Sequence, residues 1–185
     1  MSLPHAILGF LYDTPNSGYD LKKIFDTSVS HFWPADQSQI YKTLARMQQQ
    51  GWLQTEVYPQ ATRPARKVYS ITSAGKQELL TWLLTPLPAE PNRSAEMIQV
   101  FFAARLTDEQ ILRVFERAAG LMRQGLAQYD QIPRDFQHYS AYTHSPRQFY
   151  FWMLTLEIGV TQLRSNLALI EDIVRRIRAG EIPAE

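Results

Sequence analysis

The spacing of hydrophobic residues predicts three short helices before residue 51. Apolar side chains recur every three or four positions over residues 3–12, 19–25 and 40–47, as on the buried side of an amphipathic helix. Residues 13–18 contain Pro, Asn, Ser and Gly, and predict a turn between the first two helices. Three short helices joined by tight turns are typical of a helix-turn-helix.

Capping signals indicate where the second and third helices begin and end. Ser17 with Asp20, and Asp36 with Gln39, have the spacing of capping boxes at the two helix starts. Gly51 suits the left-handed residue that closes a helix. The third helix is therefore short and bounded at both ends.

The third helix is polar opposite its apolar stripe. That face starts with short and amide side chains and becomes cationic further on. A helix in the DNA major groove needs this composition, because short side chains allow close approach, amides bond base edges and cations bond phosphates. A solvated surface has the same composition, so the neighbouring elements decide between the two interpretations. The residues of this face are Ser38, Gln39, Lys42, Ala45, Arg46 and Gln49.

Beyond the third helix, the hydrophobic pattern changes to the alternation of β-strands. Apolar and polar residues alternate over residues 53–57 and 67–71, which predicts a β-hairpin. The hairpin tip, residues 58–66, holds two prolines together with Arg63 and Arg66, and is therefore basic.

A fourth helix starts after the hairpin, with Thr72 as its cap and Leu79 on its apolar side. Helix, helix, polar-faced helix, basic hairpin and helix is the order of a winged helix-turn-helix. In that fold the third helix enters the major groove, and the hairpin forms a wing beside it. A solvated loop is the alternative interpretation of the basic tip, and its position directly after a helix-turn-helix favours the wing.

The second half of the chain is predicted to be helical after a linker. Residues 86–92 hold three prolines and separate a DNA-binding domain, residues 1–85, from a helical dimerisation domain, residues 93–185. Helical spacing follows over residues 94–106 and 107–129. The fold class is therefore mainly α with a small β-hairpin.

The last predicted helix, residues 146–179, is the longest and starts with Ser145 as its cap. It would be about 50 Å long, and Glu171 with Arg175 has the spacing of an ion pair on its surface. Its apolar residues form an unbroken heptad seam, which needs a partner: the 107–129 helix, a second subunit, or, as we expect, both in a coiled-coil dimer arm. The seam consists of Met153, Leu156, Val160, Leu163, Leu167, Ile170, Val174 and Ile177.

Composition and charge limit the classes of protein to which the chain can belong. The net charge is +1, and the first 85 residues hold a small basic excess of eight Lys or Arg against six Asp or Glu. Cysteine is absent, which excludes disulfides and cysteine metal sites. No apolar run reaches the roughly 18 to 20 residues of a membrane span, and the N-terminus lacks signal-peptide features. We expect a cytoplasmic protein with no membrane partner.

The sequence contains no recognisable catalytic or metal-binding constellation. The four histidines are scattered without metal-ligand spacing, and neither a phosphate loop nor a nucleophile elbow occurs. We therefore expect no enzyme, no metal and no cofactor. An aromatic cluster at the start of the last helix favours core packing, with a small-molecule effector pocket as the alternative. Its members are Tyr139, Tyr142, Phe149, Tyr150, Phe151 and Trp152.

Three blocks of the first half resemble the signatures of PadR-type transcriptional regulators. They are Ser-Gly-Tyr-Asp-Leu at 17–21, Ser-Gln-Ile-Tyr-Lys-Thr-Leu at 38–44 and Tyr-Ser-Ile-Thr-Ser-Ala-Gly at 69–75. Residues 1–5 and 66–72 also resemble the AphA-like virulence-activator branch of this family. The second half resembles that branch only in its layout of a linker and long helices.

The resemblance implies a homodimeric winged-helix regulator on a two-fold related operator in double-stranded DNA. Tyr19 and Tyr41 would hold phosphates, and many relatives respond to small aromatic compounds, which keeps the effector alternative open. Many relatives have proline where this chain has Lys42, so operator sequence does not transfer from them. The predicted DNA contacts are Tyr19, Gln37, Ser38, Gln39, Tyr41, Lys42, Arg46, Arg63, Arg66 and Lys67.

A protein-interaction module without DNA binding is the remaining class. Such a module has no need of a cationic strip on its third helix and hairpin. Lys42, Arg46 and the basic hairpin tip therefore argue for DNA binding.

Overall fold

The computed structural model divides the chain into two compact units, Met1–Pro88 and Ala89–Glu185. Each unit has a hydrophobic core of its own. Within the described ranges, no helix is long and apolar enough to cross a membrane. The structure describes residues 3–30, 32–59, 65–87, 95–140, 142–143 and 145–183.

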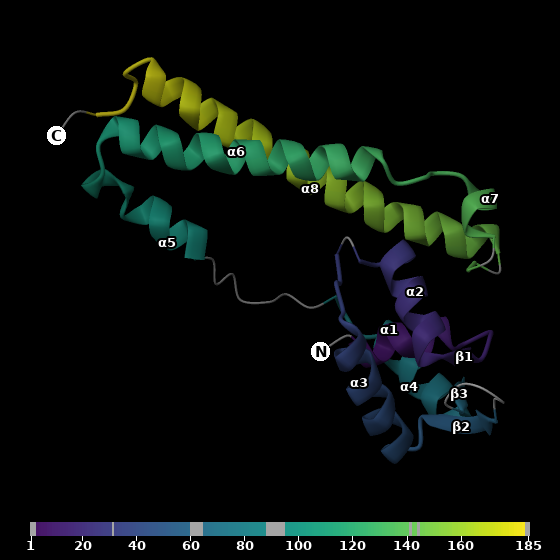
Figure 1. Cartoon of the computed structure of the whole chain (residues 1–185). Coiled ribbons are helices and arrows are strands. Elements are labelled where there is room, and N and C mark those ends of the chain that lie inside the picture. The colour runs from purple at the N-terminus through teal and green to yellow at the C-terminus, as the bar shows by residue number, and fades with distance from the viewer. Residues whose placement is uncertain are drawn as a thin grey trace. The chain divides into compact units, whose positions relative to one another are not determined.

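The first unit combines four helices with a three-stranded antiparallel sheet of order β1-β3-β2 (Figure 1). The predicted hairpin is confirmed, and its register runs from Leu53 opposite Ile71 to Tyr58 opposite Arg66. In chain order the elements are α1 (Leu3–Phe10), β1 (Asn16–Ser17), α2 (Gly18–Ser28), α3 (Gln37–Gln49), β2 (Leu53–Tyr58), β3 (Arg66–Ile71) and α4 (Ser73–Leu83).

The predicted turn at residues 13–18 is in part a strand. Asn16 and Ser17 of β1 pair with Tyr69 and Val68 of β3. A strand of two residues has no alternation that a sequence pattern could reveal, and it exists only through its partner β3. Its consequence is structural: the start of α2 is attached directly to the second strand of the hairpin.

The predicted capping boxes are confirmed. The side chain of Ser17 accepts the backbone N–H of Asp20, and the side chain of Asp36 accepts that of Gln39. Gly51 has a φ of 75° directly after α3, a left-handed conformation that glycine adopts at no steric cost. Interactions over three residues therefore set the boundaries of α2 and α3.

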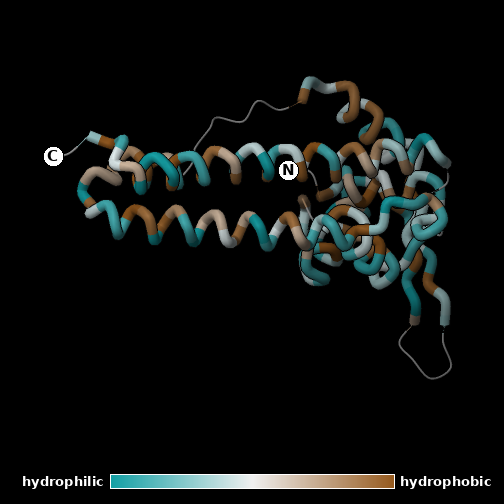
Figure 2. Tube along the Cα trace, turned by 90° about the horizontal axis from the view of Figure 1, so that it is seen from above, coloured by the Kyte–Doolittle hydropathy of each residue, from teal (hydrophilic) through white to brown (hydrophobic). Residues whose placement is uncertain are grey.

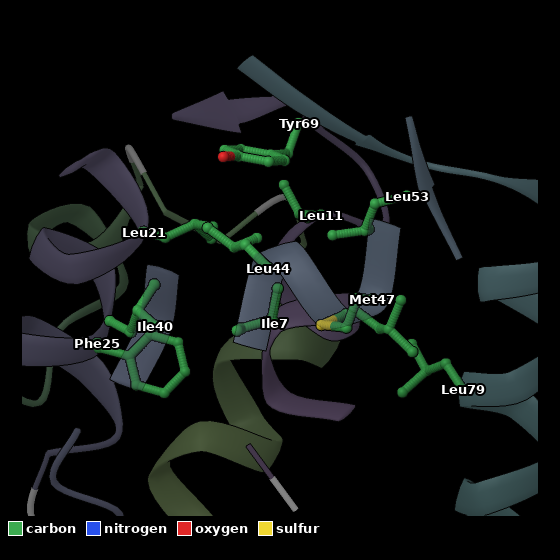
Figure 3. Close-up of a cluster of buried hydrophobic side chains, with 11 residues drawn as sticks. Ile7, Leu11, Leu21, Phe25, Ile40, Leu44, Met47, Leu53, Tyr69 and Leu79 are labelled. Carbon is green, nitrogen blue, oxygen red and sulfur yellow. The ribbon is translucent and has the colours of Figure 1, made fainter. Parts of the chain in front are cut away.

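One hydrophobic core holds the first unit together (Figure 3). The α3 stripe of Ile40, Leu44 and Met47 is 0% exposed, so this helix is fixed in rotation about its axis. Its opposite face must therefore point to solvent. The stripe packs with residues from the other elements of the unit, namely Ile7, Leu8, Leu11, Leu21, Phe25, Leu53, Tyr69 and Leu79.

The second unit is built on a hairpin of two long helices. α6 (Asp108–Asp130) packs along α8 (Pro146–Arg178), and Figure 2 shows hydrophobic and polar positions alternating along both. The helix predicted over residues 94–106 is shorter, because α5 covers only part of it and a 3-10 turn follows. The shorter elements are α5 (Ala95–Phe101), η1 (Ala103–Arg105) and α7 (Phe136–Tyr139).

The heptad seam of α8 packs against α6 of the same chain, which confirms the intramolecular half of the prediction. Leu156, Val160, Val174 and Ile177 are buried in the single chain, and the other four seam residues are partly buried. A Cβ at Gly125 of α6 would lie 3.1 Å from Leu163, so glycine allows the two helices to approach closely here.

The ion pairs of α6 and α8 differ from the predicted pair of Glu171 with Arg175. Glu171 bonds Arg123 of α6 at 2.6 Å. Arg175 instead bonds Asp172 and Glu181, both at 2.8 Å. The predicted Glu171–Arg175 pair is therefore wrong, because i,i+4 spacing permits a pair but does not exclude a partner on the neighbouring helix.

Two helical glycines make a matched test of the packing in the first unit. A Cβ at Gly75 in α4 would clash with the backbone oxygen of Trp52 and lie 2.9 Å from Ile71, whereas a Cβ at Gly9 in α1 meets nothing within 4 Å. We predict that Gly75→Ala lowers the free energy of unfolding by about 1–3 kcal/mol. Gly9→Ala should raise it by about 0.5–1 kcal/mol. Urea unfolding of the two variants measures both effects, and equal effects would contradict the packing.

Candidate nucleic-acid interface

The outer face of α3 presents amides, a hydroxyl and cations to solvent. Because Ile40, Leu44 and Met47 lie in the core, with Thr43 buried beside them, the side chains on the opposite face of α3 are directed outwards. Every predicted contact residue of this helix is exposed, as the sequence predicts. These residues are Gln37, Ser38, Gln39, Tyr41, Lys42 and Arg46.

The first turn of α3 is organised by the carboxylate of Asp36. Its Oδ1 accepts the backbone N–H of Gln39 and the hydroxyl of Ser38, both at 2.8 Å. In return, the backbone N–H of Asp36 donates to Oε1 of Gln39 at 3.1 Å. The backbone bond from Gln39, followed by the hydroxyl bond from Ser38, lowers the pKa of Asp36 below its usual value. The carboxylate is therefore ionised at neutral pH and can only accept hydrogen bonds.

Two tyrosines lie on the surface near the start of α2. Tyr41 of α3 packs against Gly18, where a Cβ would lie only 2.6 Å from the tyrosine ring, so a larger residue at position 18 would displace this ring. Tyr19 is 57% exposed, and the ammonium of Lys23 lies 4.6 Å from its ring centroid. Both tyrosines thus have accessible side chains near the start of α2.

Among the described residues of the wing, Lys67 is exposed and Arg66 is already paired. Lys67 and Arg66 of β3 are exposed, but Arg66 Nη2 bonds Oδ2 of Asp20 in α2 at 2.7 Å. No local sequence pattern predicts this contact, because 46 positions separate the two residues. Arg63 lies outside the described residues.

Asp20 joins the α2 cap to the wing. Burial raises its pKa, but the hydrogen bonds from Ser17 and Arg66 outweigh burial and lower the pKa below its ordinary value of 3.8. The ionised carboxylate therefore completes the α2 capping box and holds β3 at the same time. The two acids Asp20 and Asp36 were predicted as caps, and their bonds to Arg66 and Ser38 were not.

The aromatic cluster of the second unit divides into an inner and an outer set. Tyr139 is 3% exposed and packs against Phe149 and Trp152, with ring centroids 5.9 and 6.2 Å away. Tyr150 and Phe151 are instead exposed and contact each other. The inner set therefore packs as a core, and burial raises the pKa of Tyr139.

The described residues contain no group of three His, Asp or Glu side chains that could hold a metal ion. The first unit exposes hydrogen-bonding groups and positive charge on α3 and on the β2–β3 hairpin.

Two family models together match most of the chain. The model of the transcriptional regulator PadR-like family matches residues 7–81, and the virulence activator alpha C-terminal model matches residues 92–178. The first unit therefore belongs to the PadR-like family of transcriptional regulators, and the second unit matches the C-terminal part of virulence activators. The resemblance of the sequence to PadR proteins and its resemblance to the virulence-activator branch are thereby confirmed.

Curated relatives of this PadR-like chain are also transcriptional regulators. A probable transcriptional regulator of Mycobacterium tuberculosis is 42% identical over 98 residues, which are 52% of either chain. The negative transcriptional regulator PadR of Bacillus subtilis is 34% identical over 116 residues, which are 62% of this chain and 63% of PadR. The aligned stretches thus span less than two thirds of the relatives' own lengths.

Solved structures share the fold over nearly the whole length. Bacillus subtilis PadR in complex with operator DNA matches with a TM-score of 0.77 and 26% identity, over 96% of this chain and 99% of PadR. The Vibrio cholerae virulence activator AphA matches with a TM-score of 0.73 and 25% identity, over the same shares. A further PadR structure, with p-coumaric acid, matches with a TM-score of 0.75, 25% identity and again these shares.

The bond between Asp20 and Arg66 gives the first unit a predictable pH dependence. A carboxylate whose pKa is lowered in the folded state stabilises the fold above its unfolded pKa of about 3.8 and loses this effect as pH falls through the folded value. We predict that Asp20→Asn destabilises the protein at pH 7 and that its difference from wild type shrinks below about pH 4. Urea unfolding at pH 7 and pH 3 measures this.

Asp26→Asn is the control on the same helix, because Asp26 is exposed and its partner among the described residues is Lys22. Exposed i,i+4 pairs contribute only about 0.3–0.5 kcal/mol, so this variant should change stability little. A difference between Asp20→Asn and wild type that is the same at both pH values would contradict the assigned role of Asp20.

Proposed function

We propose that the chain regulates transcription as a homodimer that binds a two-fold related operator in double-stranded DNA. The observation that carries the proposal is the outer face of α3, which exposes amides and cations because its apolar stripe is buried. In the proposed complex, α3 lies in the major groove and the β2–β3 hairpin lies beside it. Membership of the PadR-like family and the DNA complex of Bacillus subtilis PadR support this proposal.

The proposed contacts divide into bases and phosphates. Side chains in the first turn of α3 would meet base edges, because the N-terminal residues of a recognition helix reach furthest into the groove. The hydroxyls of Tyr19 and Tyr41 and the ammonium of Lys67 would bind phosphates. Arg66 has a different role in this proposal: it positions the wing through Asp20. A regulator of this kind would act in the cytoplasm, where the sequence analysis predicts it.

The proposed dimer uses a surface other than the heptad seam, because α6 already covers the seam. Ile158 and Leu169 of α8 are 62% and 56% exposed. They are eleven residues apart, about three helical turns, and therefore lie on one side of α8, opposite the seam. Val114 and Leu121 add exposed apolar side chains on α6. Apolar side chains at this spacing on an exposed helix face suit a second copy of the chain.

A response to a small aromatic effector is a second candidate. It is supported by the p-coumaric acid complex of Bacillus subtilis PadR. The aromatic rings at the start of α8 are the candidate contacts in this chain, in particular the exposed Tyr150 and Phe151. An effector would act on DNA affinity, so it modifies the proposed function without replacing it.

The two adjacent wing residues provide a sharp test of DNA binding. Each lost phosphate contact lowers the slope of log K against log salt by about 0.9. We predict this loss for Lys67→Ala and a smaller loss for Arg66→Ala, because Asp20 already neutralises Arg66. The measurement is a salt titration with a duplex selected from a random pool, with Lys76→Ala of α4 as the control.

Three outcomes of the salt titration would count against the proposal. Equal losses for Arg66→Ala and Lys67→Ala would mean that Arg66 leaves Asp20 for a phosphate. An unchanged slope in Lys67→Ala would show that Lys67 makes no phosphate contact. Failure of the wild type to retain any duplex at low salt would refute DNA binding and favour a protein-interaction module.

The dimer surface is tested by placing a charge on either side of α8. We predict that Ile158→Asp yields folded monomers, because Ile158 is exposed in the single chain. Leu163→Asp should instead separate and unfold the helix pair α6–α8, because Leu163 packs against Gly125 of α6. Sedimentation gives the mass of each variant and circular dichroism gives its helix content. A wild type that sediments as a monomer would end the dimer proposal.

A further inference from the structure

The cap of α3 fixes which hydrogen-bonding groups Gln39 can offer to DNA. The backbone N–H of Asp36 lies 3.1 Å from the Gln39 side-chain amide. A backbone N–H can only donate, so the amide atom that faces it is the oxygen Oε1 and not the nitrogen. The oxygen is thereby turned back toward the helix start. The Nε2 group, with its two N–H donors, is left for a partner outside the helix.

The same cap gives Ser38 the opposite character. Its hydroxyl bonds Oδ1 of Asp36 at 2.8 Å. Since an ionised carboxylate only accepts, the hydroxyl hydrogen must point to Asp36. The lone pairs of Ser38 Oγ are then the groups that remain for an outside partner. Two neighbouring exposed residues therefore have fixed and opposite hydrogen-bonding roles: Gln39 donates and Ser38 accepts.

Resting on the proposed function, we infer that Gln39 is a specificity-determining residue that selects guanine in the operator. Guanine presents two acceptors, N7 and O6, in the major groove, and these match the two donors of Nε2. Adenine requires an acceptor beside a donor, and the Gln39 oxygen that would supply it is held by the cap. Cytosine presents a donor and is rejected. Ser38 selects a neighbouring base whose edge offers a donor, which is cytosine N4 or adenine N6.

Gln39→Glu tests this inference without removing the cap. Glutamate is a standard residue at this position of a capping box, and it replaces the two donors by an acceptor. The experiment selects binding sites from random duplexes for the wild type and for Gln39→Glu. We expect the wild-type motif to contain one guanine per half-site at the position that Gln39 contacts. The motif of the variant should have cytosine or adenine at this position. The variant should bind the wild-type duplex about 10- to 100-fold more weakly than the duplex it selects itself.

The chain contains a matched control in its other unit. Gln110 closes the capping box of α6, where the backbone N–H of Thr107 donates to its oxygen at 3.0 Å. Gln110→Glu makes the same change of charge and cap, and it should leave the selected motif unchanged. The added negative charge of Gln39→Glu weakens all duplexes alike, so the ratio between the two duplexes isolates base selection.

The variant Asp36→Ser tests whether the carboxylate of Asp36 fixes the hydrogen-bonding role of Ser38. Asp36→Ser keeps a capping side chain for the N–H of Gln39 but removes the carboxylate that orients the Ser38 hydroxyl. The guanine position should persist, and the position beside it should accept more bases than in the wild type.

Each outcome of the selection is decisive. A motif that is identical for wild type and Gln39→Glu would overturn the inference while leaving DNA binding intact. An A·T pair in the wild type at the position that changes would also overturn it, because that result indicates adenine pairing. A wild type that retains no duplex would refute the proposed function itself and the inference with it.

Discussion

The burial of one stripe of α3 is the constraint on which the first unit depends. Ile40, Leu44 and Met47 are completely buried and pack with side chains from α1, α2, β2, β3 and α4. A helix held at three points on one side cannot rotate, since burying another face would place polar side chains in the core. The polar side chains of α3 are therefore displayed in a fixed order. This order is what a helix needs in order to read a base sequence.

Two carboxylates then organise the polar surface. Asp36 accepts bonds from Ser38 and Gln39, and Asp20 links the α2 cap to Arg66 of the wing. Both acids have lowered pKa values, so both remain charged at neutral pH. A carboxylate beside a proposed DNA surface repels phosphate. Here, however, Asp36 accepts hydrogen bonds from Ser38 and Gln39, and Asp20 accepts one from Arg66, so each carboxylate orients the side chains around it. The positive charge left for DNA is thus concentrated on fewer side chains than the sequence suggests.

In the second unit, the long helix α8 carries apolar side chains on two sides. The heptad seam of α8 is used within the chain, where α6 covers it and the Arg123–Glu171 pair joins the two helices. The side that contains Ile158 and Leu169 stays exposed. Heptad spacing in the sequence therefore identified a packed surface correctly. Of the two partners that the sequence predicted, the 107–129 helix of the same chain is the one that the structure confirms.

The sequence by itself determined the features that depend on contacts within three or four residues. These are the boundaries of α2 and α3, the caps at Ser17 and Asp36 and the left-handed Gly51. Local spacing also predicted the two strands of the β-hairpin and the polar face of α3. Tertiary structure alone decided the pairing of β1 with β3, the Asp20–Arg66 bond and the Arg123–Glu171 bond. The physical reason is sequence separation: these partners lie roughly 50 positions apart, and only the folded cores bring them together.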